Sequence, residues 1–155
     1  MSDKIPITIN INNKDLTLNV EPRLLLVDLL RNKLELKGTH IGCDTSQCGS
    51  CMVMIDGKCI KSCSILAVQC NKKSIKTIES IGKENNLSNV QKAFKENHGL
   101  QCGFCTPGFI MTAIECKKNN LSTEEEVREF LDGNFCRCTG YQNIVKSIIS
   151  FLKMP

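Results

Sequence analysis

The sequence predicts an α+β fold in which residues 1–80 form a small sheet with one helix and residues 81–155 form a four-helix domain. Three observations predict it. Ile5, Ile7, Ile9 and Ile11 alternate with polar residues, the period-two pattern of a half-buried strand. After Gly82, helix-start patterns replace strand patterns. The 11 cysteines of the 155-residue chain include one dense group in each half.

The first half is expected to contain five strands and a helix. Residues 12–15 are typical of a turn, and Leu16, Leu18 and Val20 alternate again, so a hairpin is predicted. The Leu-rich segment 24–36 predicts a helix that Gly38 stops. The remaining strands are expected at residues 52–55, at 58–62 after the Asp56-Gly57 turn, and at 74–78.

The second half is expected to contain four short helices after a linker at residues 82–87. Ser88 and Gln91 resemble a capping box, and the helix they start is expected to stop at Gly99. A second helix is predicted to start with Thr106 as its N-cap and Pro107 as its first residue. A third is predicted to start with a capping box of Ser122 and Glu125 and to end at Gly133. The last helix is predicted at residues 141–152.

Composition excludes several classes of protein. The formal charge of +4 is spread without a basic block, and Trp is absent, so a nucleic-acid partner is not expected. No apolar run approaches the roughly 20 residues of a membrane span, and the N-terminus lacks the apolar core of a signal peptide. A cytoplasmic location is therefore expected. In a reducing compartment, clustered cysteines indicate metal ligands rather than disulfides.

The first cysteine group has the spacing of a plant-type 2Fe–2S cluster. Cys43, Cys48 and Cys51 follow the pattern C-x4-C-x2-C, and Cys63 supplies a fourth thiol. Gly42 and Gly49 suit a loop folded tightly over a cluster. Because this spacing is specific, zinc is a weak alternative here.

The second group combines C-x2-C, at Cys102 and Cys105, with C-x-C, at Cys136 and Cys138. Each pair comes just before a predicted helix, so the partial positive charges of two helix N-termini are expected to face one four-thiol site. Taken alone, this second group leaves zinc open as an alternative to an iron–sulfur cluster.

Together the two groups resemble the small iron–sulfur subunit of molybdenum hydroxylases, the relatives of xanthine dehydrogenase, aldehyde oxidoreductase and carbon monoxide dehydrogenase. The matching stretches are GCDTSQCGSC (42–51) with Cys63, QCGFCTPG (101–108) and GNFCRCTGYQNIVKSI (133–148). The resemblance covers nearly the whole chain. The motifs look most similar to those of the carbon monoxide dehydrogenase-type branch. It implies a β-grasp ferredoxin-like domain followed by a four-helix 2Fe–2S domain.

The resemblance also implies roles for individual residues. Gln101 and Cys138 would lie against the pterin of the molybdenum cofactor, and no residue of this chain would be catalytic. The implied ligands of the distal cluster, nearer the flavin, are Cys43, Cys48, Cys51 and Cys63. Those of the proximal cluster, nearer the molybdenum, are Cys102, Cys105, Cys136 and Cys138.

The function implied is electron transfer within a multi-subunit oxidoreductase. A large subunit would carry molybdopterin as its cytosine dinucleotide, and a medium subunit would carry FAD, in a heterotrimer or a dimer of heterotrimers. An aldehyde substrate is expected ahead of carbon monoxide. An N-heterocycle (purine or nicotinate) dehydrogenase and a free-standing ferredoxin are the alternatives, and a zinc-binding interaction module is a third interpretation.

The remaining cysteines and both histidines are expected to be structural. Cys59, Cys70 and Cys116 fall outside both groups and are interpreted as packing residues. His40 and His98 flank the cysteine motifs, but each site already has four thiols, so loop hydrogen bonds are favoured over metal binding. Arg137 is interpreted equally as a surface residue or as a partner of the cluster's negative charge.

Overall fold

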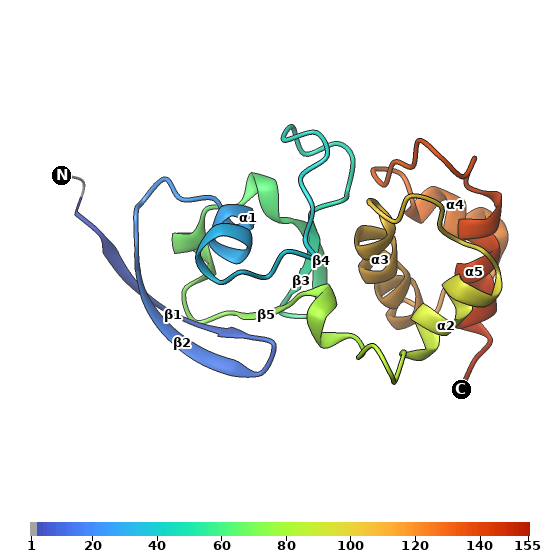
Figure 1. The fold of residues 1–155 in the computed structure, drawn as a ribbon, viewed down its shortest axis with the longest axis horizontal. Helices are drawn as coiled ribbons and strands as arrows, with labels where there is room; N and C mark the ends of the chain where they lie inside the picture. Colours follow the sequence, from blue (N-terminus) through green and yellow to red (C-terminus); the bar gives the residue numbers. More distant parts are fainter. Residues whose placement is uncertain (1–2) are drawn as a thin grey trace.

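The computed structural model describes residues 3–155 and places a β-sheet beside a group of four helices (Figure 1). The sheet opens with a hairpin of β1 (Ile5–Ile11) and β2 (Lys14–Val20), paired antiparallel from Ile5 opposite Val20. Ile7, Ile9 and Ile11 are buried, as their alternation predicts. The connecting turn is Asn12–Asn13, both at positive φ, and is therefore two residues shorter than expected.

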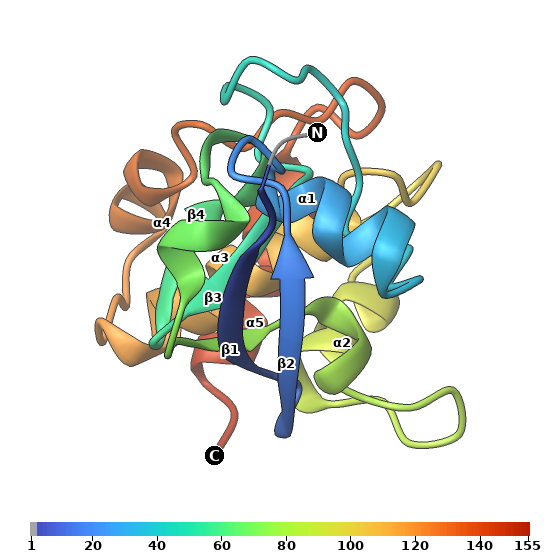
Figure 2. The ribbon, with the colours of Figure 1, turned by 90° about the vertical axis from the view of Figure 1, so that its left-hand side faces the viewer.

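The complete sheet is mixed and has the strand order β2-β1-β5-β3-β4. β5 (Ser74–Lys76) runs parallel to β1 and antiparallel to β3 (Met52–Ile55), while β3 and β4 (Lys58–Lys61) form the hairpin predicted around Asp56-Gly57. Figure 2 looks onto β1 and β2, with the α1 segment beside them. This arrangement is the predicted β-grasp sheet.

The helix of the sheet-bearing half is shorter than predicted. α1 (Leu26–Asp28) continues into a wider π-type turn at Leu29–Lys33, rather than running from residue 24 to residue 36. Leu26, Leu29 and Leu30 are nevertheless buried against the sheet. The chain then reverses through Glu35, whose φ of 57° lies in the left-handed region that no helix continues through.

Four helices make up the rest of the chain, as predicted: α2 (Asn89–Glu96), α3 (Thr106–Lys118), α4 (Glu124–Phe130) and α5 (Gln142–Leu152). They share a core in which Phe94, Phe109, Val127, Ile144 and Ile148 are fully or almost fully buried. Within residues 3–155, no helix is long and apolar enough to span a membrane.

The helix ends are displaced slightly from their predicted positions. The capping box of α4 is Thr123 with Glu126, one residue later than predicted: the Glu126 N–H donates to Thr123 Oγ1 (3.2 Å) and the Thr123 N–H donates to Glu126 Oε2 (2.9 Å). Cys105 caps α3, and Thr106 is already helical. α2 ends at Glu96, three residues before Gly99.

Helix α3 joins the two halves by packing against β3 and β4 (Figure 1). The Cys59 N–H donates to Glu115 Oε2 (3.0 Å), and Lys118 Nζ donates to the Gly57 carbonyl (2.9 Å). Gly108, near the start of α3, lies so close to Gly49 that a Cβ at position 108 would overlap the Gly49 carbonyl oxygen. The first turn of α3 therefore lies directly against the first cysteine loop.

Candidate metal centres

Most of the first cysteine group lies in the loop between the α1 segment and the β3–β4 hairpin. Cys43, Cys48 and Cys51 lie in residues 42–51, and Cys63 lies in the short 3-10 turn Ser62–Ser64 after β4. Cys51 and Cys63 are buried neighbours. Ser62 fixes them by donating both its N–H (3.2 Å) and its hydroxyl (2.7 Å) to the Cys51 carbonyl.

Backbone N–H groups of this loop point at sulfur. Cys43 Sγ accepts the N–H groups of Thr45 (3.4 Å), Gln47 (3.3 Å) and Cys48 (3.3 Å). The chain can turn this tightly because Asp44, Ser46 and Gly49 all have positive φ. The N–H groups of Cys48 and Thr45 lower the pKa of the Cys43 thiol to about 6, so the loop stabilises the thiolate that metal binding requires.

Burial has the opposite effect on other thiols. It raises the pKa of Cys51 to about 11 and that of Cys105 to about 12. These two thiols stay protonated at neutral pH in the metal-free chain, and binding a metal must release their protons.

The second cysteine group is assembled from two loops. Cys102 and Cys105 lie just before α3, while Cys136 and Cys138 lie between α4 and α5. Cys138 Sγ is 3.5 Å from Cys102 Sγ, and Cys136 lies close enough to Cys105 to raise the pKa of its thiol. Thiols from two distant parts of the sequence thus meet at one place.

Thiols in both sites lie close to one another in pairs. The second site pairs Cys102 with Cys138 and Cys105 with Cys136, and in the first site Cys51 is paired with Cys63. Among residues 3–155, no three His, Cys, Asp or Glu side chains are grouped closely enough to hold one metal ion. In the second site, two pairs of thiols would suit a cluster whose two irons each take two thiolates.

The two cysteine loops lie on the same side of the molecule (Figures 1 and 2) and are in direct contact. The Phe135 N–H donates to the Cys48 carbonyl (2.8 Å), and Asn134 Oδ1 accepts the Thr112 hydroxyl (3.1 Å). The Asn134 amide is almost fully buried against Gly49, where a Cβ would lie 2.6 Å from its Nδ2. The sequence suggests no role for Asn134 or Phe135, because Cys48 and Gly49 lie far from them along the chain.

His40 makes a second contact between the two loops, which agrees with the predicted structural role. Its ring stacks on Phe104, with centroids 4.6 Å apart, and its Nδ1 lies 2.7 Å from the Phe104 carbonyl. Gln101 and Cys138, the residues expected to face a pterin, are both exposed. Arg137 is also exposed.

The three remaining cysteines occupy packing positions. Cys59 lies on β4 and its thiol donates to the Met111 carbonyl (3.1 Å), while Cys70 and Cys116 are fully buried in the two cores. Burial raises the pKa of all three thiols, to about 11 for Cys70 and about 12 for Cys116. Buried, protonated thiols are unreactive, which supports their predicted structural role.

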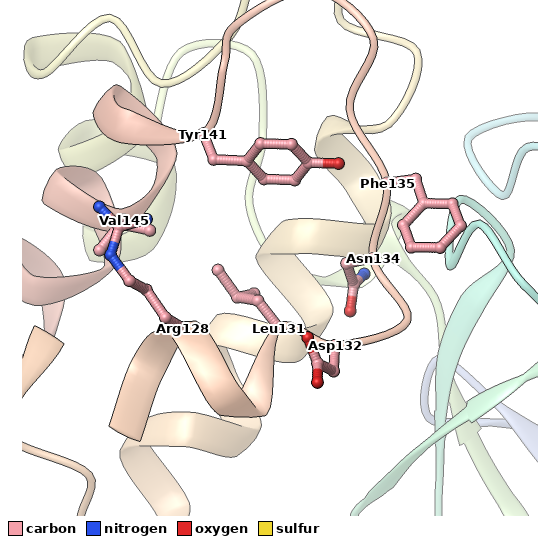
Figure 3. A pocket seen from close by; sticks show the side chains of 7 residues that line it. All are labelled: Arg128, Leu131, Asp132, Asn134, Phe135, Tyr141 and Val145. Carbon is pink, nitrogen blue, oxygen red and sulfur yellow. The ribbon is translucent and has the colours of Figure 1, made fainter. Parts of the chain in front are cut away.

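A cavity of about 220 Å³ lies behind the second cysteine loop, between α4 and α5 (Figure 3). Its lining includes Arg128, Leu131, Asn134, Phe135 and Tyr141, and it contains no cysteine. The Tyr141 ring extends across it toward the backbone that carries Asn134 and Phe135 (Figure 3). The Tyr141 hydroxyl accepts the Cys136 N–H (2.9 Å), so this ring supports the second cysteine loop from behind.

Comparison with known proteins agrees with this geometry. Residues 9–74 match the family described as a 2Fe–2S iron–sulfur cluster binding domain, and residues 77–149 match the 2Fe–2S binding domain family. The iron–sulfur-binding subunit of Escherichia coli O157:H7 xanthine dehydrogenase is 42% identical over 151 residues, covering 96% of this chain and 94% of the relative. This chain is a small 2Fe–2S subunit of the molybdenum hydroxylase family.

Other members of the family are at least as similar. The gamma subunit of caffeine dehydrogenase from Pseudomonas sp. (strain CBB1) is 45% identical over 93% of this chain and 89% of the relative. The small subunit of nicotine 6-hydroxylase from Paenarthrobacter nicotinovorans is 46% identical over 96% of this chain and 90% of the relative.

Solved structures share the fold of this small subunit. Quinoline 2-oxidoreductase from Pseudomonas putida 86 superposes with a TM-score of 0.91 at 42% identity, covering 97% of this chain and 95% of that chain. Aldehyde oxidoreductase from Desulfovibrio gigas gives 0.91 at 38% identity, covering 96% of this chain and 17% of that chain. These similarities do not single out the carbon monoxide dehydrogenase-type branch that the motifs were expected to favour.

Proposed function

We propose that this subunit binds two 2Fe–2S clusters through its eight motif cysteines and conducts electrons between partner subunits of a molybdenum hydroxylase. The approach of Cys138 Sγ to Cys102 Sγ (3.5 Å), together with the contact between Cys51 and Cys63, carries the proposal, because each iron of such a cluster needs two thiolates. The proposed ligands of the first cluster are Cys43, Cys48, Cys51 and Cys63. Those of the second are Cys102, Cys105, Cys136 and Cys138.

When bound, 2Fe–2S clusters take up and release one electron at a time. The chain's own contribution is to hold the sulfurs and to control their surroundings. The N–H groups on Cys43 Sγ stabilise negative charge in the first site, and burial of Cys51 and Cys63 keeps water from one side of it.

The surface around the cysteine loops supports docking to partner chains. Leu100, Phe104 and Phe135 are 43%, 45% and 53% exposed, although they are large and apolar, and all lie close to proposed ligands in the sequence. We infer that Gln101 and Cys138 face the molybdopterin, as its cytosine dinucleotide, on a large subunit. The first site would then face FAD on a medium subunit, in a heterotrimer or a dimer of heterotrimers in the cytoplasm.

The substrate oxidised on the large subunit is proposed to be an N-heterocycle. This reverses the order expected from the sequence, which put an aldehyde first and carbon monoxide second. Relatives named for caffeine and nicotine are 45% and 46% identical to this chain, and a structure named for quinoline is 42% identical. The aldehyde oxidoreductase structure is 38% identical. This chain's similarity thus favours a purine or pyridine-type ring over an aldehyde.

The first test is native purification through a tag on this chain, with analysis of iron, labile sulfide, molybdenum and zinc. The proposal predicts about four irons and four sulfides per chain, together with molybdenum, FAD and two larger chains. Two zincs without sulfide would disprove electron transfer. Iron and sulfide on a lone chain would indicate the free-standing ferredoxin instead.

The second test measures substrate-dependent dye reduction by the purified complex. Xanthine, caffeine, nicotine, nicotinate and quinoline are compared with aliphatic and aromatic aldehydes and with carbon monoxide. Faster reduction with an N-heterocycle than with every aldehyde supports the substrate assignment. Oxidation of aldehydes alone would restore the order expected from the sequence.

A further inference from the structure

A closed set of hydrogen bonds surrounds one thiol of the helical half. The Thr139 hydroxyl lies 3.2 Å from Cys136 Sγ and accepts the Tyr141 N–H at 3.2 Å. The Tyr141 hydroxyl in turn accepts the Cys136 N–H at 2.9 Å. Figure 3 shows the Tyr141 side chain extending toward the backbone that carries Asn134 and Phe135, next to Cys136 in the sequence. Three residues that are close in the sequence therefore fix one another around a single sulfur.

These contacts determine the direction of the Thr139 hydrogen bond. A threonine hydroxyl has one proton to donate, and its oxygen here already accepts the Tyr141 N–H. A metal-bound Cys136 is a thiolate, which can only accept. The Thr139 proton is therefore directed at Cys136 Sγ, which lies in a half-buried residue where water competes only partly.

The first cysteine site has a different source of donors. The three hydrogen bonds to Cys43 Sγ come from the backbone N–H groups of Thr45, Gln47 and Cys48. A point substitution cannot remove a backbone donor without adding proline or moving the loop. In the second site, the backbone N–H groups of Cys138 and Thr139 also act on the Cys136 thiol. One donor to this thiol, the Thr139 hydroxyl, is by contrast a side chain that can be replaced.

We infer that Thr139 is a positioning residue whose hydroxyl raises the reduction potential of the cluster in the helical half. The inference rests on the proposed function. Reduction adds one electron, supplied by the partner's molybdenum centre or by a chemical reductant, and no bond is formed or broken. The added negative charge falls partly on the thiolate sulfurs. A hydrogen bond to sulfur is therefore stronger in the reduced state and favours reduction.

The experiment is a redox titration of the purified native complex, followed by EPR, for the wild type and for T139V and T139S. Valine keeps the β-branch and removes the donor, whereas serine keeps the donor. T139V is expected to reduce the equilibrium constant for reduction of one cluster by about tenfold, which is about 59 mV for one electron. T139S is expected to match the wild type, and the other cluster is expected to be unchanged in both variants.

A matched control is T106V. Thr106 also lies beside a proposed ligand, Cys105, but its hydroxyl has no hydrogen-bond partner among residues 3–155. T106V is therefore expected to leave both potentials unchanged. Should T139V fail to bind the cluster, T139A removes the same hydroxyl with a smaller side chain and gives the same test.

The outcomes separate this inference from the proposed function. Absence of iron and sulfide from the wild type would overturn both. Two clusters with the same potentials in the wild type and T139V would overturn only the role of Thr139. A T139S shift as large as that of T139V would show that loop packing, not the hydroxyl, is responsible, and would also overturn it.

Discussion

The two cysteine sites reach similar sets of four thiols by different routes. The first takes three of its cysteines from a single short loop, and backbone N–H groups surround Cys43 Sγ. The second joins two loops that are far apart in the sequence and uses the Thr139 and Tyr141 side chains to hold Cys136. Local sequence is thus enough to build most of the first site, whereas the second depends on the packing of α3 and α5.

The largest expected effect is loss of one cluster without the other. C63A is expected to reduce iron from about four to about two per chain and to leave the helical-half cluster, and C136A is expected to do the reverse. Iron and sulfide analysis with EPR measures both. C116A, which removes a buried thiol outside both sites, is the control and should retain both clusters. Loss of both clusters in C63A would show that the sites do not form independently.

A glycine in each site allows their packing to be compared. Gly49 has a φ of +72°, and a Cβ there would lie 2.6 Å from Asn134 Nδ2 and from the Gly133 carbonyl oxygen. Gly103 has a φ of +82°, and a Cβ there would meet nothing within 4 Å. G49A is expected to destabilise the protein by about 2–4 kcal/mol, from backbone strain plus overpacking. G103A is expected to cost about 1–2 kcal/mol, from strain alone.

Thermal unfolding of the two glycine variants, monitored by circular dichroism, measures this difference. The Tm of G49A should fall clearly further than that of G103A. Equal decreases would mean that the contact between Gly49 and Asn134 relaxes without loss of stability.

The metal-free thiols should differ in reactivity. The pKa of Cys43 is lowered to about 6, whereas that of Cys105 is raised to about 12. Because the thiolate is the reactive form, alkylation of Cys43 should rise with pH through about 6 and then level off, while Cys105 should react slowly at every pH below about 10. Mass spectrometry after timed iodoacetamide labelling of the cluster-free chain tests this. A midpoint near the ordinary thiol value of about 8.5 for Cys43 would contradict the role of the loop N–H groups.

The smallest effect is expected at Lys61, whose Nζ donates to the Ser46 (2.9 Å) and Gln47 (3.1 Å) carbonyls and so fastens the first loop. K61M should weaken this loop by about 1 kcal/mol, the typical contribution of such hydrogen bonds. The first-site cluster should then bleach several-fold faster in the presence of a chelator. K58M, on the same strand but exposed, should bleach at the wild-type rate.

Local patterns are sufficient to predict most of the fold. The alternation of Ile7, Ile9 and Ile11 identifies β1, and Asp56-Gly57 identifies the β3–β4 turn, because each signal depends only on neighbouring residues. The cap of α4 is harder to place, because Ser122 and Thr123 both have an acidic residue three positions later. Only the folded loop distinguishes the two.

The cysteine spacing predicts which thiols to consider but not how the two sites touch. The Phe135 N–H bond to Cys48 and the burial of Asn134 against Gly49 depend on how α3 packs on the sheet, which no local pattern encodes. The hydrogen bond from Thr139 to Cys136 likewise appears only once the loop closes on Tyr141. The ranking of aldehyde, carbon monoxide and N-heterocycle substrates does not follow from this sequence for a different reason: the substrate pocket is expected on another chain.

The close approach of Gly108 to the Gly49 carbonyl limits how the two halves of this subunit can be exchanged with those of a relative. In a chimera that joins the first half of one such subunit to the second half of another, positions 49 and 108 come from different proteins and their backbones must still fit together. Any side chain at position 108 would push the first cysteine loop away from Phe135. The halves of this subunit should therefore be exchangeable only as a matched set that keeps both glycines and the Asn134-Phe135 pair.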